Sequence, residues 1–463
     1  MFNATVEGML TLAELGQKAA SGEVTTVLVV FPDLYGRFMG KRVPAKFFME
    51  SVAAHGMHAC NYLLTVDMEM EVVEGYKYAN WEKGYGDFHC VPDLNSLRLV
   101  TWLEKSAMVI CDVETEPGHE PVRVSPRGML RRQIARLDEM GFMAMGASEV
   151  EHYVFKETYE SAKEKNFDNL VPFGWYIEDY HMLQGTKEEV LHSVIREHLE
   201  RSGMPVESSK GEWGPGQHEV NMRYAEVLET ADRHAVYKQA AKEIAMQVGL
   251  AVTFMAKWRA DLAGSSMHLH MSLWDKAGKR ALFPGPRKMG PLEVSDEFRW
   301  FLGGWMQHAR ALSVFYAPYP SSYKRYQFQS WAPTNIAWSY DNRTSGFRVV
   351  GHGNSLRIES RIPGADANPY LAFAATIAAG IDGIKNKIEP PPIFEGDVYS
   401  AANLPKVPAN LRDAIGELEQ SAMLREAFGA DVVAHYLHFF RTEQKKFDQV
   451  VTSWERERYF ERA

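Results

Sequence analysis

The sequence predicts an α+β protein with a small amino-terminal domain and a larger carboxy-terminal domain. Its 463 residues exceed what one ordinary hydrophobic core holds. Strand-like segments dominate the first hundred-odd residues, whereas long helical patterns separated by strands follow. Residues 114–126 are punctuated by Pro and Gly, which is typical of a linker. We therefore place the two domains at residues 1–115 and 120–463.

The amino-terminal domain is predicted to be rich in β-structure. It begins with an amphipathic helix at 9–20, which Gly22 ends. Two β-branched segments are predicted to pair as a hairpin around a Pro-Asp-Leu-Tyr-Gly turn. The predicted elements after the first helix are strands at 24–31 and 37–43, a helix at 46–55, an irregular stretch at 61–93, and strands at 96–102 and 107–113.

The larger domain alternates helical periodicity with short strands. Pro126 suits the first position of a helix, because its missing N–H is not needed there. Residues 317–330 are aromatic and loop-like, and we expect them to form a mobile flap. The last helix is charged and aromatic, which suits an intersubunit contact. Helices are predicted at 126–140, 187–203, 225–249, 296–315, 368–387, 411–418 and 431–462.

Composition narrows the class of protein. Hydrophobic residues make up 46% and charged residues 24%, as in an ordinary globular chain. The net charge of −9 disfavours a nucleic-acid partner. The longest apolar stretch, 369–380, is too short to span a bilayer, and the first residues lack the features of a signal peptide. Three irregularly spaced cysteines, Cys60, Cys90 and Cys111, fit a reducing compartment, so we expect a cytoplasmic protein.

One predicted strand carries imidazoles on a single face. Successive side chains of a strand alternate between its faces, so His268, His270 and Ser272 share one face and Met267 and Leu269 the other. Two histidines in this pattern raise the odds of a metal site only modestly, because a lone strand histidine is more often a packed residue.

Carboxylates recur in the same kind of pattern. Glu149 and Glu151 share a strand face, Glu212 and Glu219 flank a Pro-Gly turn, and Glu359 lies between two arginines of its own face. Each pattern alone is also typical of an amphipathic strand whose charged face meets water. Together they offer a ligand set suited to Mg²⁺ or Mn²⁺. Zinc is disfavoured at this set, since the chain has no Cys-x-x-Cys pair.

Arginines accompany the carboxylates. Surface exposure is the ordinary explanation for each one, yet their interleaving with aromatics and Gly better fits clamps for carboxylate or phosphate. Divalent ions with arginine forks indicate metal-assisted phosphoryl chemistry on an acidic substrate. No glycine-rich phosphate loop or dinucleotide motif occurs in the sequence. The arginines are Arg325, Arg343, Arg348, Arg357 and Arg361.

These segments, in this order, resemble the glutamine synthetase family, type I-like. The resemblance implies a β-grasp-like domain at 1–115. It also implies a large catalytic domain at 120–463, with a curved antiparallel sheet (half-barrel) backed by helices. The segments that carry it are Glu149-Val-Glu151, Gly216-Gln-His-Glu219, Gly264-Ser-Ser-Met-His-Leu-His270, Ser322-Tyr-Lys-Arg325, Asn342-Arg343, Arg357-Ile-Glu-Ser-Arg361 and Ala367-Asn-Pro-Tyr-Leu-Ala-Phe373.

The resemblance also assigns roles to residues. Two metal positions are implied, the first beside the acid substrate and the second on the ATP phosphates. The first set is Glu151, Glu212 and Glu219, and the second is Glu149, His268 and Glu359. The nucleotide site would comprise His270, Ser272, Arg357, Glu207 and Tyr224. Gly264, Arg325 and Arg361 would hold the acid substrate, with Arg343 and Arg348 on the transferring phosphate.

The chemistry implied by the family has two steps. Glutamate's side-chain carboxylate attacks the γ-phosphoryl group of ATP, and an amine then displaces phosphate from the acyl phosphate. Two or three Mg²⁺ or Mn²⁺ ions per site and the arginines would neutralise the charge that develops. The family assembly implies a homo-oligomer, a dodecamer of two hexameric rings with sites between adjacent subunits.

Three positions depart from the family pattern. Trp331 stands where glutamine synthetases carry a glutamate that helps bind ammonium, and it can only offer apolar surface or a stacking face. The family's Asp-Gly-Ser-Ser element is absent, and its nearest counterpart is Val66-Asp67-Met68-Glu69. Asp67 is therefore a candidate base donated across the subunit interface, and the alternative is an ordinary solvated aspartate of a loop. Ala263 replaces an asparagine on the glutamate side.

Two of these changes, Trp331 and the missing Asp-Gly-Ser-Ser element, affect the part of the site that would bind and deprotonate ammonium. The chain therefore resembles the γ-glutamyl-amine (γ-glutamylamide) ligases of the family, and small hydroxyalkyl-, alkyl- or arylamines suit Trp331 better than a long polyamine. The alternatives are a glutamine synthetase that uses ammonium, or a catalytically silent member with a structural or regulatory role.

Overall fold

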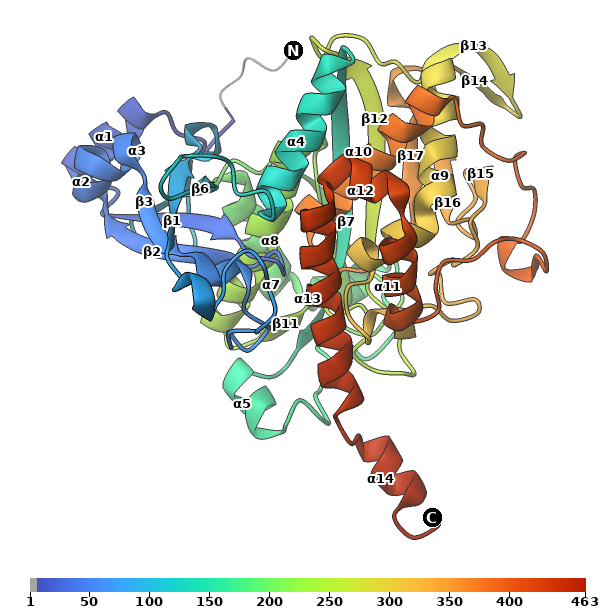
Figure 1. Cartoon of the computed structure of the whole chain (residues 1–463). Helices are drawn as coiled ribbons and strands as arrows, with labels where there is room; N and C mark the ends of the chain where they lie inside the picture. Colours follow the sequence, from blue (N-terminus) through green and yellow to red (C-terminus); the bar gives the residue numbers. More distant parts are fainter. Residues whose placement is uncertain (1–5) are drawn as a thin grey trace.

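The computed structural model describes residues 6–463; residues 1–5, the start of the predicted amino-terminal domain, lie outside the described part. Within it, strands form a six-stranded sheet, a nine-stranded sheet and a two-stranded ribbon. Figure 1 shows the six-stranded sheet in blue, beside a larger body in which helices back a strongly curved sheet. The predicted α+β class and its two-sheet architecture are confirmed.

The amino-terminal sheet follows the predicted hairpin. Its helices and strands are α1 (Leu12–Ser21), β1 (Thr26–Pro32), β2 (Phe38–Pro44), α2 (Ala45–Phe47), the π-helical turn η1 (Phe48–Val52), α3 (Ala53–His55), β3 (Met57–Cys60), β4 (Asp87–Pro92), β5 (Arg98–Leu99) and β6 (Ser106–Thr115). The strand order is β2-β1-β6-β4-β3, and β1 pairs with β6 in parallel. Short 3-10 turns lie at η2 (Asn61–Leu64), η3 (Trp81–Lys83) and η4 (Leu94–Ser96).

Two predictions for this region were wrong. Residues 61–93 are not wholly irregular, because β4 lies within them and pairs with both β3 and β6. It does alternate, with Phe88 and Cys90 buried, but the Gly-, Tyr- and Trp-rich residues before it obscured the period. The predicted strand at 96–102 shrinks to Arg98–Leu99, because the side chain of Asp93 accepts the backbone N–H of Asn95 and starts a tight turn.

The nine-stranded sheet is organised around its longest strand, β7. Its strands are β7 (Phe142–Phe155), β8 (Val206–Gly211), β9 (Gln217–Met222), β10 (Ala225–Glu226), β11 (Ala251–Thr253), β12 (Met267–Asp275), β15 (Trp338–Tyr340), β16 (Phe347–Val350) and β17 (Arg357–Ser360). The order is β15-β16-β17-β12-β7-β9-β8. β13 (Pro284–Met289) and β14 (Leu292–Val294) form the separate ribbon. Pairing sets His268 opposite Glu149 and Glu219 opposite Glu151.

Helices pack against the larger sheet (Figure 1). The helices of this part of the chain are α4 (Pro126–Glu139), α5 (Tyr159–Glu164), α6 (Met182–Thr186), α7 (Glu189–Glu200), α8 (Val227–Gln247), α9 (Asp296–Tyr316), α10 (Pro369–Asn386), α11 (Leu411–Gln420), α12 (Ala422–Phe428), α13 (Ala430–Asp448) and α14 (Ser453–Tyr459). Ala-rich α10 contacts α9, α4 and α8. Leu312 and Phe315 of α9 are buried in the core. The short turns are η5 (Ser322–Arg325), η6 (Gly353–Ser355) and η7 (Val398–Ser400).

The predicted single helix at 431–462 was wrong. The helix ends at Asp448, and α14 begins anew after Thr452. Thr452 and Glu455 form a capping box, in which each side chain accepts the other's backbone N–H, and this restarts the helix. Figure 1 shows α14 projecting from the body of the molecule. Among residues 6–463, no helix combines the length and apolar character needed to cross a bilayer.

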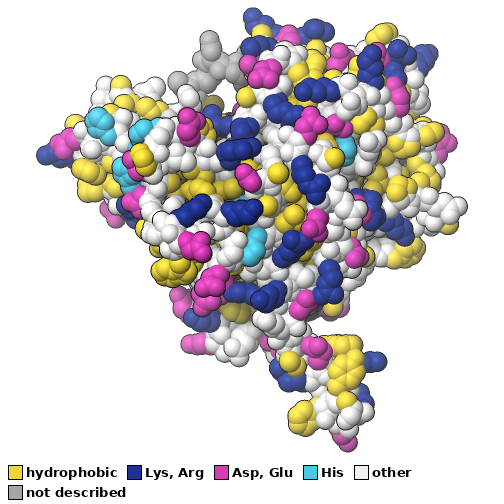
Figure 2. Space-filling view, in the orientation of Figure 1, with side chains coloured by type: hydrophobic (Ala, Val, Ile, Leu, Met, Phe, Trp, Pro, Cys, Tyr) yellow, Lys and Arg dark blue, Asp and Glu magenta, His cyan; other side chains and the backbone are white. Residues whose placement is uncertain are grey.

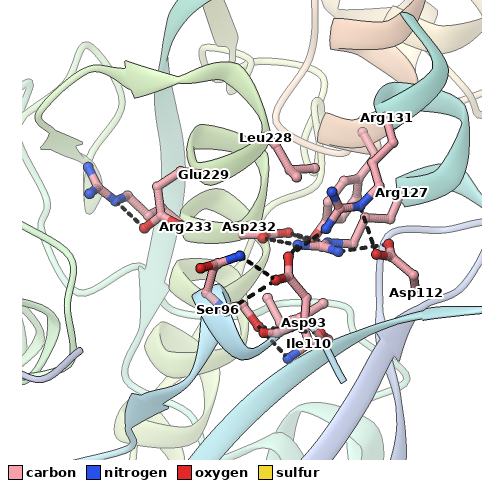
Figure 3. A network of polar contacts seen from close by, with 12 residues as sticks. Asp93, Ser96, Ile110, Asp112, Arg127, Arg131, Leu228, Glu229, Asp232 and Arg233 are labelled. Carbon is pink, nitrogen blue, oxygen red and sulfur yellow. Dashed lines mark hydrogen bonds and ion pairs between the residues drawn. The ribbon is translucent and has the colours of Figure 1, made fainter. Parts of the chain in front are cut away.

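A buried arginine links the amino-terminal region to two helices of the larger domain (Figure 3). Arg127 of α4 is 1% exposed and donates to Asp232 of α8 at 2.7 and 3.0 Å. It also donates to Asp93 and Asp112 of the amino-terminal region, each at 2.7 Å. Burial opposes ionisation of Asp93, but its bonds to Arg127 and the nearby charge of Arg131 outweigh burial and lower the pKa of its carboxyl.

We predict that Arg127→Met lowers the free energy of unfolding by about 3–5 kcal/mol, because three carboxylates lose their shared partner. The matched control is Arg131→Met, whose side chain is 39% exposed and pairs with Asp93 and Asp112. That change should lower stability by about 1 kcal/mol or less. Urea unfolding of both variants measures the difference, and equal losses would contradict a central role for Arg127.

Candidate active site

A cavity of about 600 Å³ opens on the face of the nine-stranded sheet that carries the charged side chains. Most of the residues proposed from the sequence line it, although they come from segments far apart in the chain. A pocket of this size accommodates small-molecule substrates. The proposed residues along its wall are Glu149, Glu151, Glu212, Glu219, Gly264, His268, Arg325, Trp331, Arg343, Arg348 and Arg361.

Three carboxylates converge at one end of the cavity. Glu151, Glu212 and Glu219 each bring an oxygen within 4.8 Å of the others. Glu151 is held in place because it accepts the backbone N–H of Ser266 at 2.8 Å and the Gln217 amide at 3.1 Å. These contacts orient the carboxylate toward its two neighbours.

The protein neutralises the negative charge of this cluster only in part. Burial and the charges of Glu151 and Glu219 raise the pKa of Glu212 to about 9, against the opposing charge of Lys210. Burial and the charges of Glu149 and Glu151 raise the pKa of Glu219 to about 7. Lys210 lies 2.6 Å from Glu212 and supplies one positive charge. Crowded oxygen ligands with excess negative charge fit a hard divalent ion.

A second cluster lies alongside the first. His268 Nδ1 is 3.0 Å from Glu149 and 3.7 Å from Glu359, which brings together the predicted second ligand set. His270, assigned by resemblance to the nucleotide site, also reaches Glu149 at 3.0 Å. Glu149, His270 and Glu359 can likewise direct one ligand atom each at a common point. The ligand atoms of His270 and of both carboxylates thus all lie within 4.8 Å of one another.

The charge balance of the second cluster is opposite to that of the first. Burial opposes ionisation of Glu149, but His270 and His268 outweigh it and hold its pKa well below the ordinary value. Burial likewise opposes ionisation of Glu359, and Arg361 with both histidines lowers its pKa to about 2. The buried Nε2 of His270 lies 3.0 Å from Glu149 but has no hydrogen-bond partner among the described residues. An unpartnered imidazole nitrogen beside two ionised carboxylates fits a metal ligand.

Arginines also line the cavity. Arg348 donates to Glu359 at 2.8 Å and to Asp341 at 2.6 Å, and Arg361 donates to Glu359 at 2.6 Å. Arg343 is exposed and lines the cavity. Their guanidinium groups can bind carboxylate or phosphate oxygens as charge-assisted donors.

Gly264 and Arg325 depend on each other. Arg325 is buried and donates to the carbonyls of Ile362 at 2.7 Å and Arg361 at 3.0 Å. A Cβ atom at Gly264 would lie 2.6 Å from Arg325 Cγ and 2.6 Å from the carbonyl oxygen of Ala256. Only glycine therefore allows Arg325 to pass this close to the strand that leads to the histidines.

Aromatic side chains flank the carboxylates. Trp331 and Trp213 have ring centroids 5.9 Å apart and interplanar angle 59°, and both line the cavity. Tyr180 lines it too, with Lys210 Nζ 4.2 Å from its ring centroid. Sequence reasoning missed Trp213, Tyr180 and Lys210. Trp213 follows the proposed ligand Glu212 directly, and this adjacency could have indicated it.

The segment that carries Tyr180 is anchored beneath the cavity by a buried ionic cluster. His218 Nε2 lies 2.7 Å from Glu178 and 2.9 Å from Glu188, and all three side chains are buried. Burial disfavours the charged imidazole, but the two carboxylates outweigh it and raise the pKa of His218 to about 9. The cluster fixes both ends of the loop at 178–188.

Seven proposed residues lie outside the wall of this cavity: Glu359 and His270 of the second cluster, and the five described next. Asp67 is 2% exposed, accepts the backbone N–H of Glu69 and Glu71, and pairs with Lys446. The other four flank the histidine strand or lie near strand ends, and their proposed nucleotide contacts stay predictions. Arg357 donates to His270 at 3.2 Å, Ser272 accepts from Trp274, and Glu207 and Tyr224 are exposed.

With this geometry in place, comparison with known proteins decides the family. Residues 123–459 match the glutamine synthetase catalytic domain. The chain belongs to the glutamine synthetase family. Ligases of this family use ATP and divalent metals, and the carboxylate and imidazole clusters of this member fit that equipment. It is accordingly an amide-forming, ATP-dependent ligase.

Relatives within the glutamine synthetase family are similar over nearly the whole chain. Gamma-glutamylethanolamide synthetase GlnA4 of Streptomyces coelicolor is 46% identical over 453 residues, 98% of this chain and 96% of that protein. Glutamate–isopropylamine ligase of a Pseudomonas species is 36% identical over 441 residues, 95% of each chain. A solved GmaS/ADP complex superposes with a TM-score of 0.84 at 29% identity, covering 96% of this chain and 99% of that one.

We predict that Glu212→Gln weakens the binding of Mn²⁺ about 10-fold or more, because one of three converging oxygens is lost. Calorimetric titration of the purified protein with Mn²⁺ measures the affinity. Glu197→Gln is the control, since Glu197 is exposed on α7 and pairs with Arg201. If Glu212→Gln binds Mn²⁺ as the unmodified protein does, the three carboxylates do not form a metal site.

Proposed function

We propose that this protein joins the γ-carboxylate of glutamate to a small organic amine, with ATP as the source of energy. The observation that carries the proposal is the position of Trp331 and Trp213, which place apolar surface beside the carboxylate clusters. A charged ammonium ion gains little from such a wall, whereas the carbon atoms of an organic amine can be buried against it. One relative is named for a γ-glutamylethanolamide product and another for joining glutamate to isopropylamine, and both names support this choice.

The reaction proceeds in two steps. A γ-carboxylate oxygen of glutamate attacks the γ-phosphorus of ATP, and the bond to the ADP oxygen breaks, which gives γ-glutamyl phosphate and ADP. The amine nitrogen then attacks the acyl carbon, and the carbon–oxygen bond to phosphate breaks. The amine loses a proton to a base, and the products are the γ-glutamylamide and phosphate.

The residues of this chain act as clamps and charge partners. Arg325 and Arg361 bind the carboxylates of glutamate, beside Gly264. Arg343 and Arg348 neutralise the oxygens of the transferring phosphoryl group. Mg²⁺ or Mn²⁺, two or three ions per site, would be held by the two clusters and supply Lewis-acid stabilisation of phosphate charge. Those clusters comprise Glu151, Glu212 and Glu219, and Glu149, His268 and Glu359 with His270.

The base comes from a neighbouring subunit in this proposal. Asp67 lies outside the cavity of its own chain, in the loop between β3 and β4. A ring of subunits can bring this loop to the next cavity, since head-to-tail contacts close into rings. The proposed assembly is a dodecamer of two hexameric rings. The nucleotide would lie against His270, Ser272 and Arg357, with Glu207 and Tyr224 at the edge.

The direct test compares acceptors. Phosphate release is measured with ATP, Mg²⁺ and glutamate in the presence of ammonium or of ethanolamine, isopropylamine and a polyamine. We expect a higher kcat/KM with a small alkyl- or hydroxyalkylamine than with ammonium. Ammonium as the best acceptor would instead identify a glutamine synthetase, and no turnover with any acceptor would favour a silent family member.

We predict that Trp331→Glu raises the kcat/KM for ammonium relative to that for isopropylamine by about 10-fold or more. The carboxylate can bind the cationic form of either acceptor, but the carbon atoms of isopropylamine lose about 1.4 kcal/mol or more of apolar contact. Phe328→Glu is the matched control: Phe328 is in the same segment and 69% exposed, but it is not part of the cavity wall. An unchanged ratio in Trp331→Glu would remove this residue from the amine pocket.

A further inference from the structure

A second group of possible metal ligands lies in the amino-terminal sheet, away from the cavity. Across the sheet, His58 of β3 is paired with His89 of β4, and His89 is paired with Glu114 of β6. Directly paired residues project from the same face of a sheet, so these three side chains are neighbours. Figure 2 shows histidine and acidic side chains together on the surface formed by this sheet.

A turn brings a further histidine to this row. β6 ends at Thr115, and the chain returns so that Glu114 forms a bridge with Pro121. His119 lies in this turn with a φ of 52°, and its backbone N–H donates to the carbonyl of Thr115. This backbone geometry aims the imidazole of His119 back at His89 and Glu114.

Three ligand atoms meet at distances that suit one ion. The Nδ1 atoms of His89 and His119 are 3.2 Å apart. Glu114 Oε2 is 3.5 Å from the Nδ1 of His119 and 3.9 Å from the Nδ1 of His89. Zn²⁺ in proteins has bonds of about 2.0–2.2 Å to nitrogen and oxygen, so a tetrahedral site has ligand edges of about 3.3–3.5 Å. Small side-chain adjustments therefore suffice.

The tautomer of His89 is also set for metal binding. Its Nε2 lies 2.7 Å from the carbonyl oxygen of His55. Because a carbonyl can only accept a hydrogen bond, Nε2 carries the proton and Nδ1 presents its lone pair to the cluster. A ligating histidine whose other nitrogen donates to a backbone carbonyl is the arrangement that orients metal-binding imidazoles.

We propose that His89, Glu114 and His119 bind a divalent ion of the zinc class, with a fourth position left to water. Two imidazoles and one carboxylate favour such an ion over Mg²⁺, which prefers oxygen ligands. The side chain of His119 is 60% exposed, which gives the ion a path from solvent. The ion ties the turn after β6 to β4, next to the chain that leads into α4. The inference is independent of the proposed function.

The test is a Zn²⁺ titration of the full-length protein in excess Mg²⁺, followed by calorimetry. We expect one Zn²⁺ per chain to bind at this site and to raise the melting temperature. His119→Ala should weaken this binding by at least about 100-fold, and His89→Gln should do the same. Co²⁺ in place of Zn²⁺ should give the visible absorption of a tetrahedral site, and His119→Ala should abolish it.

A neighbouring histidine provides the matched control. His58 stacks on His89 with ring centroids 5.1 Å apart, but its Nε2 faces Glu116 at 3.3 Å. His58→Ala should therefore keep wild-type Zn²⁺ affinity. The melting temperature of metal-free His119→Ala serves as the folding check. Wild-type Zn²⁺ affinity in this variant would overturn the proposal. So would zinc binding that is lost in Glu219→Gln and kept in His119→Ala, because the ion would then be in the cavity.

Discussion

The repulsion between carboxylates gathered around β7 is the constraint on which the rest of the larger sheet depends. Glu149 and Glu151 project from the same face of this strand, and pairing adds Glu219 beside Glu151. Coulomb energy between such groups is large away from water, so they cannot all stay ionised without positive partners. The protein balances this charge differently at two neighbouring positions. Around Glu149 the protein supplies imidazoles, and around Glu219 it leaves the charge for an ion.

The opposite pKa shifts in the two clusters follow from this division. The pKa of Glu359 falls to about 2 because Arg361 and the histidines outweigh the effect of burial. The pKa of Glu212 rises to about 9 because burial and its acidic neighbours outweigh Lys210. The cluster around Glu149 and Glu359 is preorganised by the chain itself, whereas the cluster of Glu151, Glu212 and Glu219 can be completed by a bound cation. This arrangement suits phosphoryl transfer, in which cations must be positioned before charge develops.

Local patterns predicted the parts of the fold that depend on neighbours in sequence. The alternation around His268 and the Pro126 helix start needed only strand and helix periodicity, and both are confirmed. The break before α14 was also readable, since Thr452 and Glu455 carry a capping-box pattern that was overlooked. β4 was hidden because its alternation spans few residues after an irregular stretch.

Sequence reasoning could not predict the features that depend on packing between distant segments of the chain. The gathering of the proposed ligands around β7 was expected only from the family resemblance, because no local rule gives the register of β7 with β9 and β12. Tyr180 enters the cavity wall only because His218 holds the loop ends at Glu178 and Glu188. No spacing in the sequence connects these three residues.

The aromatic wall sets how far the site can discriminate between acceptors. Burying one methylene group contributes about 0.8 kcal/mol, so a three-carbon alkyl group gains about 2.4 kcal/mol against Trp331 and Trp213. That difference corresponds to about a 50-fold preference, since about 1.4 kcal/mol is a factor of ten. A carboxylate at position 331 would reverse the balance, because it would bind the cationic form of any acceptor and leave carbon atoms without a partner surface. The choice between ammonium and an organic amine can thus rest on one side chain, while the ligand clusters and arginines serve both reactions equally.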